Sequence, residues 1–180
     1  MQALSQFIDR TLDLTESRLL CSPFDPDWRS DCEVEQRGND TLWRPAIQSP
    51  RVCFDGLANA VEAEIHPDII DYYSSYWSGT LEAVSEEGRV SLIQLWNTRD
   101  FDRLIANLVG HALGKIRARE SFTVFFANTD PDTEYFLSIA NDTGIVLLEE
   151  PGRPPLREVE SDISTFLGRL EPKIRQPDIY

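Results

Sequence analysis

The chain has 180 residues, and 31 Asp and Glu side chains against 17 Lys and Arg give it a formal net charge of −14. Such an acidic protein is repelled by phosphate backbones and by anionic lipid, so we expect it to bind neither nucleic acid nor lipid directly. With 41% hydrophobic residues the chain can form a core. Its length fits one domain or at most two small ones, and we expect residues 1–180 to form one.

The first half of the chain predicts helices separated by one irregular region. Apolar residues at helical spacing indicate a helix over residues 2–20, and residues 21–51 are loop-rich, with one short strand around Leu42 and Trp43. A helix follows over residues 54–64. Pro67 then restarts a helix that continues over residues 68–76.

The second half alternates strands with one long helix. Residues 79–84 and 89–96 are predicted to form a hairpin, and Asn97 or Thr98 to cap a helix that runs to Arg119. Further strands are expected over residues 122–128, 134–140 and 145–149, then a helix from Ser161 or Asp162, and a tail over residues 173–180. This order predicts an α+β fold, with a mixed, largely antiparallel sheet packed with helices.

Acidic residues are concentrated in two segments that contain neither Lys nor Arg. Residues 52–88 hold eight carboxylates, and residues 120–152 hold seven. Each segment therefore faces either water or a positively charged ligand. The first segment also contains aromatic residues among its acids, a mixture that suits the capture of Lys or Arg by ion pairing and stacking. The alternative, which the sequence leaves open, is that these rings belong to the core.

Patterns for catalysis and metal binding are missing from the sequence. Two histidines without a zinc or calcium motif predict no metal site. We expect His66 to cap or pack at a helix junction and His111 to form a structural hydrogen bond, with a ligand or base role as the alternative. Gly110 and Gly114 indicate the close approach of a neighbouring element.

The cysteines and the ends of the chain indicate a cytoplasmic protein. Cys21, Cys32 and Cys53 lie too far apart for a CxxC pair, so we expect free thiols. No apolar run reaches the roughly 18 residues of a membrane span, and no signal peptide is visible at the start.

Several sequence blocks carry a resemblance to one protein family. They are residues 65–69 (IHPDI), 72–73 (YY), 76–83 (YWSGTLEA), 92–97 (LIQLWN), 107–113 (NLVGHAL), 125–129 (FFANT), 148–152 (LEEPG) and 155–159 (PLREV). Taken together, from about Trp43 to Pro172, these blocks resemble the SecY-interacting Syd proteins of the SUKH superfamily.

This resemblance implies a SUKH-like fold with an acidic groove and a binding function without enzymatic activity or cofactor. The protein would be a cytoplasmic monomer held at the cytoplasmic face of the inner membrane by the SecY translocation channel. It would monitor or negatively regulate uncomplexed or improperly assembled SecY. Basic cytosolic loops of SecY would bind acidic residues between aromatic walls, and our hypothesis assigns these roles to Glu62, Asp68, Asp71, Glu82, Trp77 and Trp96.

Two other functions compete with this one. The superfamily also contains immunity proteins, and an acidic protein can neutralise a basic toxin by covering its nucleic-acid site. A hydrolase that uses a carboxylate pair with His111 is the third interpretation, although nothing specific in the sequence supports an enzyme.

Overall fold

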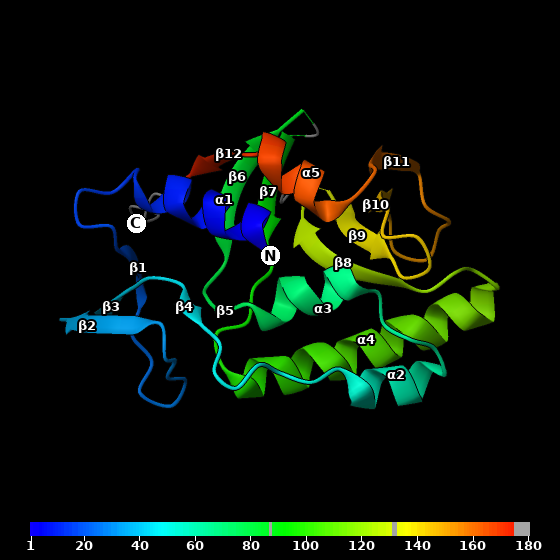
Figure 1. Ribbon diagram of the computed structural model, residues 1–180, viewed down its shortest axis with the longest axis horizontal. Coiled ribbons are helices and arrows are strands. Elements are labelled where there is room, and N and C mark those ends of the chain that lie inside the picture. Colours follow the sequence, from blue (N-terminus) through cyan, green and yellow to red (C-terminus); the bar gives the residue numbers. More distant parts are fainter. Residues whose placement is uncertain (87, 131–132, 175–180) are drawn as a thin grey trace.

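A seven-stranded antiparallel sheet organises the chain in the computed structural model, which describes residues 1–86, 88–130 and 133–174 (Figure 1). The strand order across the sheet is β11-β10-β9-β8-β7-β6-β12. The strands span Arg157–Glu160 (β11), Val146–Glu149 (β10), Phe136–Ala140 (β9), Thr123–Asn128 (β8), Gly88–Leu92 (β7), Leu81–Ser85 (β6) and Glu171–Lys173 (β12). The predicted α+β fold is confirmed, and so are the five strands expected between residues 79 and 149.

Tight turns fix the register of these strands. In the β9–β10 turn, Gly144 has φ +78° and its N–H donates to the carbonyl of Ala140 at 2.8 Å. A side chain at Gly144 would also meet the ring of His66, because an added Cβ would lie 2.6 Å from the nearest ring atom. Glycine alone satisfies both the positive φ and the close approach of the ring. The turn therefore packs directly against His66.

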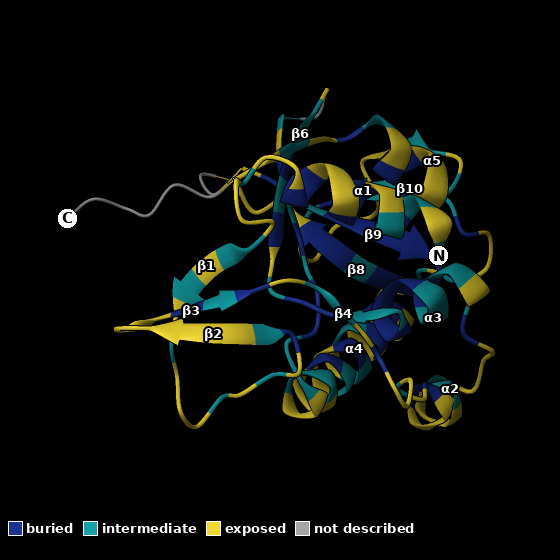
Figure 2. Ribbon diagram, turned by 60° about the vertical axis from the view of Figure 1, so that its left-hand side comes forward, coloured by how far each residue is buried: buried dark blue, intermediate teal, exposed yellow. Residues whose placement is uncertain are grey.

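One face of the sheet forms the core with three helices, α1 (Gln2–Leu12), α3 (Pro67–Ser74) and α5 (Ile163–Arg169). The alternation of the strands sends a set of fully buried side chains to this face, among them Val90, Leu92, Val124, Phe126, Leu137, Ile139 and Val146. The Phe126 ring meets Tyr72 of α3 at 5.6 Å and Phe166 of α5 at 5.7 Å between centroids. Figure 2 shows β8 and β9 buried beneath these helices.

Local signals explain where α3 and the long helix α4 (Thr98–Ala118) begin. His66 caps α3, because its Nδ1 accepts the N–H of Asp68 at 3.2 Å and Pro67 occupies the first turn. Asn97 caps α4 by accepting the N–H of Asp100 at 3.0 Å. The predictions for His66 and Asn97 are confirmed. Near the end of α4, Ile116 is 60% exposed, whereas Lys115 is buried.

The N-terminal third departs most from expectation. The first helix ends at Leu12 rather than residue 20, and Arg18 turns back with φ +51° to pair with Asp9 and Asp13. The predicted loop contains a three-stranded sheet of β1 (Leu20–Pro23), β3 (Asp40–Trp43) and β2 (Glu33–Arg37), and β4 (Ala46–Ile47) pairs with β5 (Tyr76–Trp77). Figure 2 shows β1–β3 extending from the main body, largely exposed. The strand β3 confirms the short strand predicted around Leu42 and Trp43. The short strands β1 and β2 were not predicted, because they have no apolar alternation that would indicate them.

Smaller differences concern strands, a helix and glycines. The strands β11 and β12 were not predicted, and β12 includes residue 173, while residues 175–180 of the expected tail lie outside the described residues. The helix predicted over residues 54–64 is α2 (Asp55–Val61). The expected close neighbour of Gly110 and Gly114 is wrong, because a Cβ at either residue would have no heavy atom within 4 Å.

The three cysteines are free thiols, as predicted. Cys21 and Cys53 are exposed, but Cys32 is buried, and burial raises the pKa of its thiol to about 12. In Ellman's assay at pH 8 we expect two thiols to react in the native protein and the third only on unfolding. Three equal native rates would contradict this packing of Cys32.

Candidate functional site

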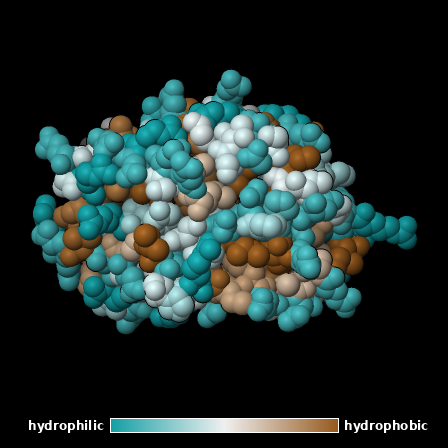
Figure 3. Space-filling model, viewed as in Figure 1, coloured by the Kyte–Doolittle hydropathy of each residue, from teal (hydrophilic) through white to brown (hydrophobic). Residues whose placement is uncertain are grey.

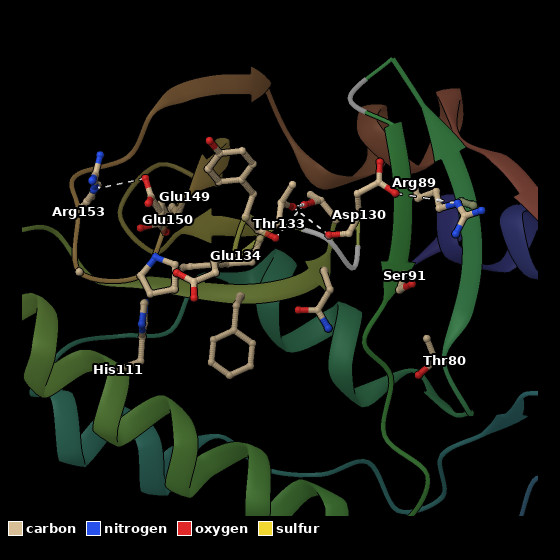
Figure 4. A pocket seen from close by; sticks show the side chains of 18 of the residues that line it. Thr80, Arg89, Ser91, His111, Asp130, Thr133, Glu134, Glu149, Glu150 and Arg153 are labelled. Atoms are coloured by element: carbon tan, nitrogen blue, oxygen red, sulfur yellow. Dashed lines mark hydrogen bonds and ion pairs between the residues drawn. The ribbon is translucent and has the colours of Figure 1, made fainter.

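A groove of about 1490 Å³ lies between the C-terminal half of α4 and the sheet face opposite the core. Four α4 residues form one wall, and the sheet contributes residues that alternate with the core residues, including Glu82, Ser91, Phe125, Phe136 and Glu149. Figure 4 shows these walls, with His111 and Arg153 at one end and Ser91 and Thr80 at the other. We call this cavity the groove.

Charged side chains of both signs line the groove. The carboxylates are Glu82, Glu120, Asp130, Glu134, Glu149 and Glu150, and the cations are Arg89, Lys115, Arg153 and Lys173. Six negative charges against four positive ones leave it acidic by two. Five of the six carboxylates come from the second cation-free segment of the sequence, residues 120–152.

A buried ionic network joins α4 to the floor of the groove. The ammonium of Lys115 binds Glu149 of β10, which is 0% exposed, and also donates to Glu120 at 2.8 Å. The second oxygen of Glu149 accepts the hydroxyl of Ser138, which is also fully buried. Every charge at this point therefore has a partner, as a buried charge requires.

The network shifts the pKa values of its members toward the charged forms. Burial acts to raise the pKa of Glu149, but hydrogen bonds from Lys115, Ser138 and Thr123 outweigh burial and lower it. Burial likewise acts to lower the pKa of Lys115, and its bonds to Glu120 and Glu149 outweigh that effect and raise it. Lys115 and Glu149 are thus both ionised at neutral pH.

His111 lies one turn before Lys115 and forms the structural hydrogen bond that the sequence predicted. Its Nε2 lies 2.9 Å from Oγ1 of Thr123, and its ring meets Phe125 at 5.9 Å and Phe136 at 6.1 Å between centroids. Burial is the largest effect on its pKa and lowers it from 6.5, assisted by the charge of Lys115. The imidazole is neutral at pH 7 and held among aromatic rings.

Of the acidic residues proposed from sequence, only Glu82 lies in the groove. It accepts the hydroxyl of Ser91 and faces Lys173 across the β6–β12 pair. Asp71 on α3 pairs with Arg51 at 2.7 Å, so a cation just outside the first segment neutralises it. Asp68 lies beside His66 at the start of α3, and Glu62 is exposed at the end of α2.

The proposed aromatic walls also lie outside the groove. Trp77 is 5% exposed, and its neighbours Tyr72 and Tyr73 are fully buried, so these rings belong to the core. Trp96 is half-buried, donates from Nε1 to the carbonyl of Trp28 at 2.7 Å and stands edge-on to Trp43. The structure does not bring the six proposed residues together.

The acidic and aromatic groove residues that sequence reasoning missed belong to the second cation-free segment. Glu134 and Glu150 lie at the rim, and Phe125 and Phe136 are half-buried at the floor. Their charge signal was visible in the sequence. The site was instead predicted in the first cation-free segment because of its aromatic residues, and most of these rings are buried in the core. Within the described residues, no group of three His, Cys, Asp or Glu could hold a metal ion.

Removing one member of the buried pair tests its importance. We expect Lys115→Met to lower the free energy of unfolding by about 3 kcal/mol, because Glu149 would remain buried without its cation. Adding Glu149→Gln to Lys115→Met removes that unpaired charge and should recover most of the loss. Urea unfolding of the single and double variants measures this coupling. A double variant no more stable than Lys115→Met would contradict it.

The lowered pKa of His111 predicts a pH dependence of stability. Just below pH 6.5 the unfolded chain binds a proton at this residue and the folded chain does not, so stability falls as the pH falls through this window. His111→Gln should therefore lose less stability than wild type between about pH 7.5 and about pH 5.5, measured by urea unfolding. Equal losses in the two proteins would show that His111 titrates normally in the folded state.

Comparisons with known proteins agree with the sequence resemblance. A family model described as Syd protein (SUKH-2) matches residues 1–172. The chain is 39% identical to Protein Syd of Pseudoalteromonas atlantica over 153 residues, covering 83% of this chain and 82% of that protein. It is 37% identical to Protein Syd of Hahella chejuensis (93% and 89% covered) and 33% identical to that of Alteromonas mediterranea (94% of each). The chain therefore belongs to the Syd family.

Proposed function

We propose that the protein is a binding protein, not an enzyme, and that its groove receives a basic cytosolic loop of the SecY translocation channel. In this role it monitors or negatively regulates uncomplexed or improperly assembled SecY. The observation that carries the proposal is the composition of the groove, in which five of the seven carboxylates of the second cation-free segment line one cavity.

The carboxylates of the groove differ in how available they are to a cation. Lys115 already forms ion pairs with both Glu149 and Glu120. Glu134 is exposed and has no ion-pair partner among the residues described, and Glu150 pairs only with the exposed Arg153, at 3.4 Å. The Glu150 side chain is 23% exposed and that of Arg153 is 67% exposed. A pair with one largely exposed member contributes little free energy, so a basic partner can displace Arg153. Glu134 and Glu150 are therefore the carboxylates that we assign to partner binding, with Glu82 at the other end.

A basic loop is the partner chemistry that fits these rim carboxylates. Cytosolic loops of membrane proteins carry an excess of Lys and Arg, and opposite charges raise association rates and specificity. In the described part of the chain, no helix is long and apolar enough to cross a membrane. A basic loop of SecY would thus bring this acidic chain to the cytoplasmic face of the membrane without direct lipid binding.

The residues proposed from sequence remain a second, separate contact surface in this proposal. Asp68 and Asp71 lie together on α3, and Glu62 precedes them at the end of α2. A SecY loop that extended beyond the groove could reach them. Separate variants of the two surfaces distinguish their contributions.

Charge reversal in the groove tests the proposal in a pull-down of detergent-solubilised SecY. We expect Glu134→Lys combined with Glu150→Lys to weaken SecY binding at least about tenfold, because two available carboxylates become repulsive. Wild-type binding should also weaken at high salt. Asp68→Lys with Asp71→Lys tests the α3 surface in the same way.

The matched control changes the net charge equally outside the groove, with Glu16→Lys and Asp102→Lys, both exposed. It should bind SecY within about twofold of wild type, since long-range charge is screened beyond about 8 Å at physiological salt. Equal binding by the groove variant and this control would overturn the groove assignment. Retention of a basic nuclease toxin in place of SecY would replace the function with that of an immunity protein.

A further inference from the structure

Two glycines on α4 occupy helical positions where the chain itself gives them no packing role. Glycine within a helix lowers stability by about 1 kcal/mol relative to alanine. At Gly110 and Gly114 an added Cβ would have no heavy atom within 4 Å, and neither residue has a positive φ. Alanine would therefore fit both positions and strengthen the helix.

Only one of the two glycines faces the groove. Gly114 lines it together with His111 and Ala118, which lie about one turn before and after it, whereas Gly110 does not line it. Between His111 and Ala118 on this wall, Gly114 itself adds no side chain. The space at Gly114 thus belongs to the volume that a partner can enter.

The surroundings of Gly114 combine aromatic rings with charged groups. On one side His111 contacts Phe136, at 6.1 Å between ring centroids. On the other side Lys115 binds Glu149, whose cross-strand neighbour is again Phe136. Gly114 and the half-buried Phe136 thus line the same end of the groove. Figure 4 shows Glu134, Glu149 and Glu150 gathered above His111 at this end.

We propose that Gly114 keeps this end of the groove open for a large apolar side chain of the partner, a side chain that lies between α4 and Phe136. The inference rests on the proposed function and specifies the partner further, as an extended peptide segment in which an apolar residue adjoins Lys or Arg. The cation binds Glu134 or Glu150 at the rim while the apolar residue enters below. This arrangement matches protein interfaces, which combine an apolar centre with a polar rim.

The size of the groove favours a peptide segment over a small molecule. Pockets for small ligands measure about 300–1,000 Å³, and the groove measures about 1490 Å³. Its exposed apolar side chains include Tyr135 at 40% and Ile174 at 37% exposure. A chain segment that runs along the groove would cover these side chains as well as the space at Gly114.

The test compares Gly114→Leu with the matched control Gly110→Leu, using solubilised SecY as the probe. Leucine is a good helix former, so both variants should unfold at temperatures at or above that of wild type. We expect Gly114→Leu to weaken SecY binding about tenfold or more, as for the loss of a central interface contact. Gly110→Leu should bind within about twofold of wild type. Gly114→Ala, a milder change, should stabilise the fold and weaken binding less than leucine.

The outcomes separate this inference from the proposed function. If wild type binds SecY and the groove charge reversal weakens that binding, but Gly114→Leu binds normally, the open space at Gly114 is not used and only the inference fails. Equal loss with Gly110→Leu would also overturn it, because the effect would not depend on the groove. If charge reversal in the groove has no effect, the proposed function fails and the inference fails with it.

Discussion

The ion pair between Lys115 and Glu149 is the constraint on which the groove depends. A carboxylate that is 0% exposed requires a cation and further hydrogen bonds, and only α4 supplies the cation among the described residues. The C-terminal half of α4 is therefore held at a fixed distance from β10, and the groove is the space that remains beside this attachment. Replacing both members of a buried ion pair by apolar residues is often neutral for stability, whereas removing one member lowers stability strongly. We therefore assign the pair mainly the role of fixing the position of α4.

The same pair also divides the acidic residues of the groove into two kinds. Glu149 and Glu120 are satisfied within the protein, whereas Glu134 and Glu150 remain available at the rim. The negative charge of the chain is thus not spread evenly over the groove. Because some of the carboxylates are already paired, fewer of them are free to bind a basic partner than their number indicates. Figure 3 shows hydrophobic patches among hydrophilic surface on the face of the molecule seen in Figure 1. In the groove, the half-buried rings of Phe125 and Phe136 beside available carboxylates suit a segment of mixed basic and apolar character.

Local signals in the sequence were sufficient to predict most of the main sheet and the long helix α4, but not the small β1–β3 sheet. The cap at Asn97 predicted the start of α4, because it depends on the hydrogen bonds of a single residue. The strands β1 and β2 depend instead on backbone pairing between short segments, which leaves no periodic pattern in the sequence. For the site, the excess of carboxylates in residues 120–152 was visible, but which of them share a cavity depends on strand alternation and on the Lys115 contact. The rings of Tyr72, Tyr73 and Trp77 drew the prediction to α3, and they are buried in the core.

Photo-cross-linking in membranes tests most directly where the partner lies. A photoreactive amino acid placed at Asn128, which is exposed and lines the groove, reports on the groove, and one at Asp71 reports on α3. The account predicts a SecY adduct from Asn128 that disappears at high salt. An adduct from Asp71 with none from Asn128 would contradict it, because the partner would then bind α3 and leave the groove empty.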